Sequence, residues 1–267
     1  MSNVNLEKKN PYITKKSNVF VYVAHLKVEF DQAKMKLLIV MLILMFSGFT
    51  AVISQKYMNE ILKAAGFELK NPSTPTLASF LSDFLGDSSL YILIIILLGM
   101  GTFSNELEVN KQVYFTLSRP ISRSNYYFTR SLILTIGIAL ATIIGSLIVY
   151  AYSLIYFDPT SFEKIILILV IIAFQYSSIY SIMIMFSTRY SQSTAGVLGF
   201  VTFLSEALIA FIEPLKWFSP LALSGDWPKI LSGTIKPLDL TADFVALFLW
   251  TIIPLLIGWL IYQKRDL

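Results

Sequence analysis

The chain of 267 residues contains no cysteine and only one histidine, His25. Without cysteine there can be no disulfide, no thiolate metal site and no cysteine nucleophile. A metal site built on His25 would need carboxylates as its other ligands, and none cluster suitably along the sequence. There is also no His-Glu-x-x-His motif. We therefore expect no metal site and no enzymatic activity in this chain.

Charge is scarce as well. Asp, Glu, Lys and Arg make up 14% of the residues, whereas soluble domains carry about 25%. Hydrophobic residues make up 55%, and the mean hydropathy is +0.67. A soluble protein of this size cannot cover its surface with so few charges. The composition therefore predicts an integral membrane protein, and the first apolar run, which follows a Lys-rich segment, is expected to be a retained span.

Six apolar runs are candidates for spanning a bilayer, whose core needs roughly 20 helical residues. Barrel strands alternate polar and apolar residues, whereas residues 92–98 and 165–172 are apolar throughout. The sequence therefore predicts an all-α integral membrane protein with six transmembrane helices. We place these helices at residues 37–54, 88–104, 132–157, 165–186, 195–212 and 244–262.

Residues 1–36 form a different kind of segment. Apolar residues recur in it at helical spacing, which predicts an N-terminal amphipathic helix lying on the cytoplasmic membrane surface. The alternative is a cytosolic helix packed on the protein itself. Residues 37–267 show neither an internal repeat nor a linker, so we expect one transmembrane domain there. The apolar positions are Val19, Tyr22, Val23, Leu26, Phe30 and Ala33.

Lysine and arginine predict the orientation. If both termini are cytoplasmic, the inner segments hold twice as many of these residues as the outer segments, in agreement with the positive-inside rule. We therefore expect a multi-pass protein of the cell membrane with both termini in the cytoplasm. The outer loop at 213–243 carries four prolines and two tryptophans. It either lies at the interface or re-enters the protein, or it is an ordinary extracellular loop.

The stretch between the second and third predicted spans carries the most specific pattern. Acidic residues come first, a short amphipathic run follows, and the stretch ends in Leu117-Ser-Arg-Pro-Ile-Ser-Arg123. The residue before a proline is disfavoured in the helical region, so the short helix should end near Arg119. Ser122 or Ser124 is then placed to cap the next membrane helix.

This stretch resembles the corresponding segment of ABC transporter permeases of the type-2 family, which have an acidic start, a short helix and a Leu-Ser-Arg-Pro-hydrophobic-Ser-Arg sequence. The ending Tyr262-Gln-Lys-Arg-Asp-Leu267 and the six-span layout are also similar to that family. The sequence departs from the family at Lys111 and Gln112, which stand where relatives often have Gly-Thr.

The resemblance implies that the short segment is a coupling helix, which contacts a separate ATPase subunit. The implied contact residues are Glu108, Val113, Tyr114, Phe115, Leu117, Ser118, Arg119 and Pro120. A P-loop contains a Gly-Lys pair, and this chain has none. Two copies of the ATPase would therefore bind ATP and Mg, while this chain would hold no cofactor. It would pair with a second permease subunit, identical or related, among membrane lipids and without nucleic acid. Export is favoured over import.

Two features within the spans remain open to more than one interpretation. Glu206 lies inside the fifth apolar run, where it either lines a transport pathway or sits in the outer headgroup zone. Gly137, Ala141 and Gly145 recur every four residues and predict close helix packing, within the subunit or, less favoured, between subunits. Two other function classes also remain open: a secondary transporter driven by an ion gradient, and a membrane scaffold without transport.

Overall fold

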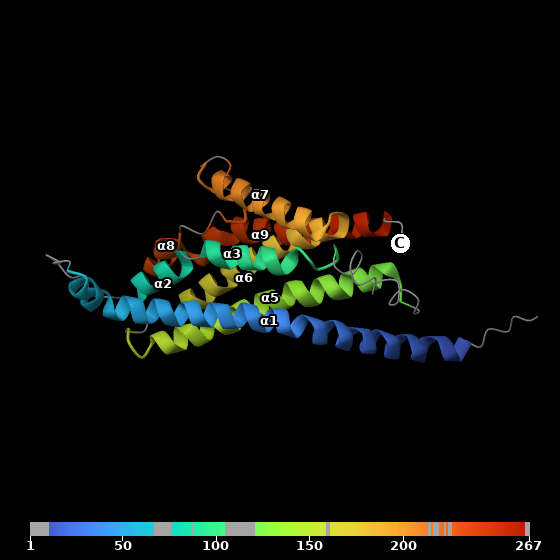
Figure 1. Cartoon of the computed structure of the whole chain (residues 1–267), viewed down its shortest axis with the longest axis horizontal. Coiled ribbons are helices and arrows are strands. Elements are labelled where there is room, and N and C mark those ends of the chain that lie inside the picture. The colour runs from blue at the N-terminus through green and yellow to red at the C-terminus, as the bar shows by residue number, and fades with distance from the viewer. Residues whose placement is uncertain are drawn as a thin grey trace, which may run out of the picture.

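All regular elements in the described part of the chain are helices (Figure 1). The computed structural model describes residues 11–66, 76–86, 88–104, 121–158, 161–212, 215, 219–221, 223 and 226–264. The prediction of an all-α fold is confirmed for these residues. The elements are α1 (Pro11–Ala64), α2 (Leu77–Gly86), α3 (Ser88–Gly99), α5 (Arg123–Ser153), α6 (Phe162–Arg189), α7 (Gln192–Ala210), α8 (Trp227–Ser232), the 3₁₀ helix η4 (Pro237–Leu240) and α9 (Thr241–Lys264).

Five helical stretches among the described residues are long and apolar enough to cross a membrane. Each overlaps one of the predicted spans, and together they define a multi-pass membrane protein. By length and composition, five of the six predicted spans are found among the described residues. The expected second span, 88–104, contains only the 12-residue helix α3, which is about 18 Å long at 1.5 Å per residue and too short for a core of about 30 Å. The five stretches are Tyr22–Met58, Arg123–Ser153, Phe162–Arg189, Gln192–Ala210 and Pro237–Lys264.

The N-terminal region differs from the expectation of a separate surface helix. Helix α1 runs without a break through residue 36 into the membrane span, over 54 residues. The face that it buries carries His25 and Glu29, whereas Tyr22 and Phe30 of the expected apolar face are exposed. Glu29 is buried because it forms an ion pair with Arg130 of α5, which is described below. Ala33 of the expected apolar face is buried beside His25 and Glu29.

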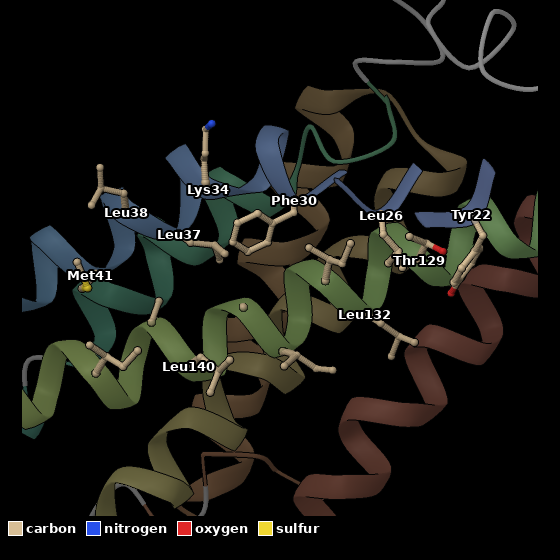
Figure 2. Close-up of a pocket in the computed structure, with 15 residues that line it drawn as sticks. Tyr22, Leu26, Phe30, Lys34, Leu37, Leu38, Met41, Thr129, Leu132 and Leu140 are labelled. Atoms are coloured by element: carbon tan, nitrogen blue, oxygen red, sulfur yellow. The ribbon is translucent and has the colours of Figure 1, made fainter. Parts of the chain in front are cut away.

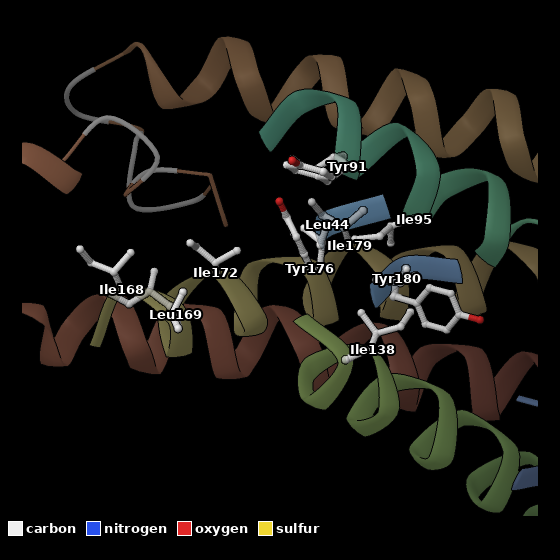
Figure 3. Packing of buried hydrophobic residues seen from close by; sticks show 14 of the residues in the cluster. Leu44, Tyr91, Ile95, Ile138, Ile168, Leu169, Ile172, Tyr176, Ile179 and Tyr180 are labelled. Carbon is white, nitrogen blue, oxygen red and sulfur yellow. The ribbon is translucent and has the colours of Figure 1, made fainter. Parts of the chain in front are cut away.

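Helix α6 forms the centre of the bundle. It packs against α9, α5, α3 and α7, and its Tyr176 and Tyr180 lie among core residues of α1, α3 and α5 (Figure 3). Helices α1 and α5 lie side by side and run in the same direction. Their close approach depends on small residues, because a Cβ at Gly48 would come within 2.4 Å of the Val149 side chain.

The start of α5 agrees with the sequence-based expectation. Ser122 is the N-cap residue, and its hydroxyl accepts a hydrogen bond of 3.2 Å from the backbone N–H of Asn125. Ser124, the other candidate for the cap, instead faces Trp259 and Gln263 of α9. Helix α5 therefore begins at Arg123, and its first turn is already docked against α9.

Candidate functional site

The predicted coupling residues Glu108, Val113, Tyr114, Phe115, Leu117, Ser118, Arg119 and Pro120 lie outside the described residues. The structure does describe both ends of their segment. On one side the chain continues from α3 through a turn that includes Thr102 and Phe103, and on the other side it enters α5 at Arg123. These two ends meet in a group of buried polar residues.

The centre of this group is an ion pair between α1 and α5. The Nη1 atom of Arg130 donates to Oε2 of Glu29 at 2.9 Å and to Oε1 of Gln32 at 3.2 Å. Arg130 is 7% exposed and Glu29 is 5% exposed. Lysine, glutamate and arginine are rarely buried unless they are paired. The pairing therefore accounts for the burial of these two charged side chains between α1 and α5.

Arg130 also contacts the turn that precedes the coupling segment. Its Nε donates to the backbone carbonyl of Thr102 at 3.1 Å, and its guanidinium lies 5.7 Å from the centre of the Phe103 ring. The Thr102 hydroxyl is hydrogen-bonded to the Tyr180 hydroxyl of α6 at 3.0 Å. One arginine thus joins α1, α5 and the 100–104 turn, and Thr102 extends the connection to α6. We refer to the buried residues Glu29, Thr102, Arg130 and Tyr180, together with the exposed Gln32, as the polar cluster.

Aromatic rings surround the polar cluster. The His25 ring stacks on Tyr126 with 5.5 Å between ring centres, and its Nδ1 lies 3.8 Å from Oε1 of Glu29. Phe103 stacks on Tyr127 and also contacts Tyr262 near the end of α9. These rings exclude water from the ion pair, which strengthens its electrostatic attraction but also raises the cost of burying each charge.

The chemistry of the site favours a positioning role. Among the described residues no group of three His, Cys, Asp or Glu side chains is placed to hold a metal ion. Replacing a buried ion pair with apolar residues is often neutral for stability, whereas removing one partner costs about 3–5 kcal/mol. The Glu29–Arg130 pair joins α1 to α5, and Arg130 joins both helices to the 100–104 turn.

None of the residues of this cluster is predicted as a site residue from the sequence. A signal was present: Arg130 lies seven residues after the start of α5, on the same side of the helix as Tyr126 and Tyr127. A cation on an aromatic face of a helix interior predicts a buried partner.

Glu206 is buried within the protein. It is 4% exposed and lies on the inner face of α7 together with Ala195 and Gly199. The Ser219 hydroxyl donates to the backbone carbonyl of Glu206 at 2.9 Å and accepts from the N–H of Leu221 at 3.1 Å. The Oε1 atom of Glu206 has no hydrogen-bond partner among the described residues. The turn at 219–221 is thus bonded to the backbone of α7 at Glu206, whose carboxyl group is buried.

The three small residues of α5 lie at its boundary with α1. A Cβ at Gly137 would lie 2.6 Å from Cδ1 of Leu37, and one at Gly145 would lie 3.4 Å from Met41. Ala141, between them, is 7% exposed. In the described part of the structure, these residues face a helix of the same chain.

No protein-family model matches the chain, and no curated protein matches it. The class that the fold defines is an all-α, multi-pass membrane protein with a buried polar cluster at one end of its bundle.

Proposed function

We propose that this chain is the membrane-spanning subunit of an ATP-driven ABC transporter, and that the transporter is an exporter. The chain would pair with a second permease subunit and be driven by separate ATPase subunits. One observation carries the proposal. Both ends of the segment that resembles a coupling helix are connected to α1 by Arg130, which bonds to Thr102 and to Glu29. A segment that passes motion to membrane helices must be attached to the helices that it moves.

The attachments make a short mechanical path. Thr102 precedes the 105–120 segment by three residues, and Arg130 follows it by ten. A force on the segment therefore acts on the Arg130–Thr102 contact, and the Glu29–Arg130 pair passes it to α1. Because α1 is one continuous helix, displacement at Glu29 reaches its opposite end. Thr102 also connects the path to Tyr180 of the central helix α6.

We also propose that α2 and α3 together make a sixth crossing. Phe80 of α2 stacks on Phe157, beyond the end of α5, with 5.9 Å between ring centres. The 100–104 turn after α3 lies beside Arg130, near the start of α5. Residues 80–102 therefore cover the same distance as most of α5. Contacts of α3 with α1 support this path, because Tyr91 is hydrogen-bonded to Ser47 and Lys36 Nζ donates to the Leu98 carbonyl at 3.3 Å.

Six crossings would place both termini on one side of the membrane, as the distribution of lysine and arginine predicts. The 105–120 segment would lie on that same side. This is the side on which a cytoplasmic ATPase would reach it. The proposed ATPase contact therefore requires the six-crossing topology. The topology and the contact can each be tested by its own experiment.

Copurification tests the proposal directly. The tagged full-length chain is purified from membranes of its own cells, and the copurifying proteins are examined for a P-loop ATPase. We expect the ATPase to be recovered with the wild type and lost with Tyr114→Asp/Phe115→Asp. Tyr190→Asp is the matched control, because Tyr190 is an aromatic residue with 42% exposure in the α6–α7 connection. Unchanged ATPase recovery and transport in the double variant would contradict the proposal.

A secondary transporter driven by an ion gradient is the second candidate. Such proteins use discontinuous helices and buried charges near the membrane centre. The separate helices α2 and α3, Pro254 inside α9 and the buried Glu206 favour it. A scaffold would also use the 105–120 segment to hold a partner. Transport that continues after ATP depletion but stops when the ion gradient is collapsed would select the secondary transporter over both other classes.

A further inference from the structure

An apolar groove of about 550 Å³ runs along the outer surface between α1 and α5 (Figure 2). Its walls are formed mainly by leucine, isoleucine and methionine side chains, among them Leu38, Met41, Leu140 and Ile144. Leu140 is 53% exposed and Ile144 is 48% exposed. The groove is therefore open to whatever surrounds the bundle.

One end of the groove lies at the level where a bilayer places its phosphate groups. After Lys36, α1 continues through 19 uncharged residues, 37–55, until Lys56. This stretch is about 28 Å long, which matches a hydrocarbon core of about 30 Å. Lys34, which lines the groove and is exposed, sits one helical turn outside that core. The apolar part of the groove, from Leu37 onward, lies inside it.

A second polar group faces the same end. Thr129 lines the groove and is 4% exposed, and its hydroxyl has no hydrogen-bond partner among the described residues. A buried hydroxyl without a partner is costly, so such groups are normally satisfied. Thr129 neighbours Arg130 in α5 and lies further from the membrane core than Lys34, at the depth of Glu29. The groove thus has an apolar channel and two polar groups beyond one end of it.

We propose that this groove binds a single anionic phospholipid from the leaflet that adjoins the N-terminal parts of α1 and α5. One acyl chain lies between Met41 of α1 and Leu140 of α5. The phosphate contacts the Lys34 ammonium group, and the headgroup extends beyond it toward the depth of Thr129. The bound lipid fills the space between the two helices whose docking the polar cluster fixes.

Lys34 has a competing partner, Asp31, whose Oδ1 lies 2.8 Å from Nζ. Both side chains are more than half exposed, and exposed pairs of this spacing are weak. A phosphate can therefore displace the Asp31 carboxylate. The pair also supplies a discriminating control, because removing Asp31 releases Lys34 for the lipid, whereas removing Lys34 abolishes the contact.

The experiment measures lipid binding to the full-length chain by native mass spectrometry, with dioleoyl phosphatidylglycerol and dioleoyl phosphatidylcholine as probes. For the wild type we expect preferential retention of phosphatidylglycerol. Lys34→Gln should lower its affinity about fivefold, the usual effect of one lysine near an anionic lipid surface. Asp31→Asn should maintain or raise it. Leu140→Trp, which fills the channel from an exposed position, should weaken binding of both lipids at this site.

Three results would overturn the proposal. The first is equal retention of the two lipids by the wild type. The second is a phosphatidylglycerol preference that survives Lys34→Gln, or that falls equally with Asp31→Asn. The third is an unchanged lipid occupancy in Leu140→Trp together with a changed oligomeric state, which would assign the groove to a second copy of the chain. Thermal unfolding of each variant in lipid-free detergent shows whether it is folded, and Thr129→Val provides a second, isosteric variant of the polar end.

Discussion

Arg130 on α5 donates a hydrogen bond of 3.1 Å to the backbone carbonyl of Thr102, 28 residues earlier in the chain. The contact closes the loop that contains the proposed coupling segment. The same guanidinium group holds Glu29 of α1. A single side chain therefore joins the two ends of the loop to the N-terminal helix. Its removal should loosen both the loop and the docking of α1.

Replacement of Arg130 by methionine should strongly destabilise the protein. Glu29 would then remain buried without its cation, a change that costs about 3–5 kcal/mol. We expect a clear decrease in the thermal unfolding temperature of the detergent-solubilised chain. Arg123→Met is the matched control, because Arg123 lies on the same helix but is only half-buried, and it should have a much smaller effect.

The double variant Glu29→Leu/Arg130→Met tests whether the pair specifies docking or supplies stability. Because both charges are removed, we expect it to recover most of the unfolding temperature lost in Arg130→Met. In the proposed ABC transporter it should nevertheless lose coupling between ATP hydrolysis and transport, since Arg130 no longer connects α1 to the 100–104 turn. A double variant as unstable as the single one would show that the pair is a net source of stability.

The loss of stability caused by alanine at three glycines should depend on which atoms the new Cβ would contact. At Gly258 a Cβ would lie 2.5 Å from the Tyr127 hydroxyl and 3.2 Å from the Met185 Cα, which is backbone. We expect Gly258→Ala to cost about 1–3 kcal/mol, as overpacking does. At Gly137 the neighbour is the flexible end of Leu37, and at Gly145 the nearest atom is at 3.4 Å. Unfolding temperatures should therefore fall most for Gly258→Ala and least for Gly145→Ala.

The number of crossings can be measured because the chain has no cysteine of its own. Single cysteines at the exposed positions Lys27 and Lys264 should react with a membrane-impermeant maleimide from the same side of the membrane. Cysteines at Lys56 and Lys236, also exposed, should react from the opposite side. If Lys27 and Lys264 label from opposite sides, α2 and α3 do not cross, and the sixth crossing is excluded.

Replacement of Glu206 by glutamine should leave stability unchanged or raise it by about 1 kcal/mol. The carboxyl is buried with one oxygen unpartnered among the described residues, and a neutral amide costs less to bury than a charge. Thermal unfolding checks this result. If transport is lost in the stable variant, Glu206 acts in the pathway. A large loss of stability would instead mean that the carboxylate has a structural partner.

The long apolar runs of the sequence were sufficient to predict where most of the membrane helices lie. Long apolar runs such as 165–186 can only be helices in a bilayer, and α6 occupies that region. The N-cap at Ser122 could also be predicted, because Pro120 restricts the backbone before it. In these places a local physical rule is enough to fix the structure.

The remaining features depend on contacts between distant residues. Nothing near Glu29 in the sequence indicates that it meets Arg130, 101 residues away. The same contact explains why His25 and Glu29 are buried on the face of α1 that meets α5, which no local pattern indicates. The short length of α3 likewise could not be read from its composition, because residues 88–99 are as apolar as a complete span.

The 54 residues of α1 form a helix about 81 Å long, more than twice the thickness of a hydrocarbon core. Such a rod has no joint at the membrane surface that would absorb rotation. A tilt of α1 at Glu29 must therefore displace the far end of the helix, near Gln55 and Lys56, in proportion to its distance from Glu29. Fluorescent probes at the two ends of this one helix would therefore report in real time, from opposite sides of the bilayer, when the protein changes state.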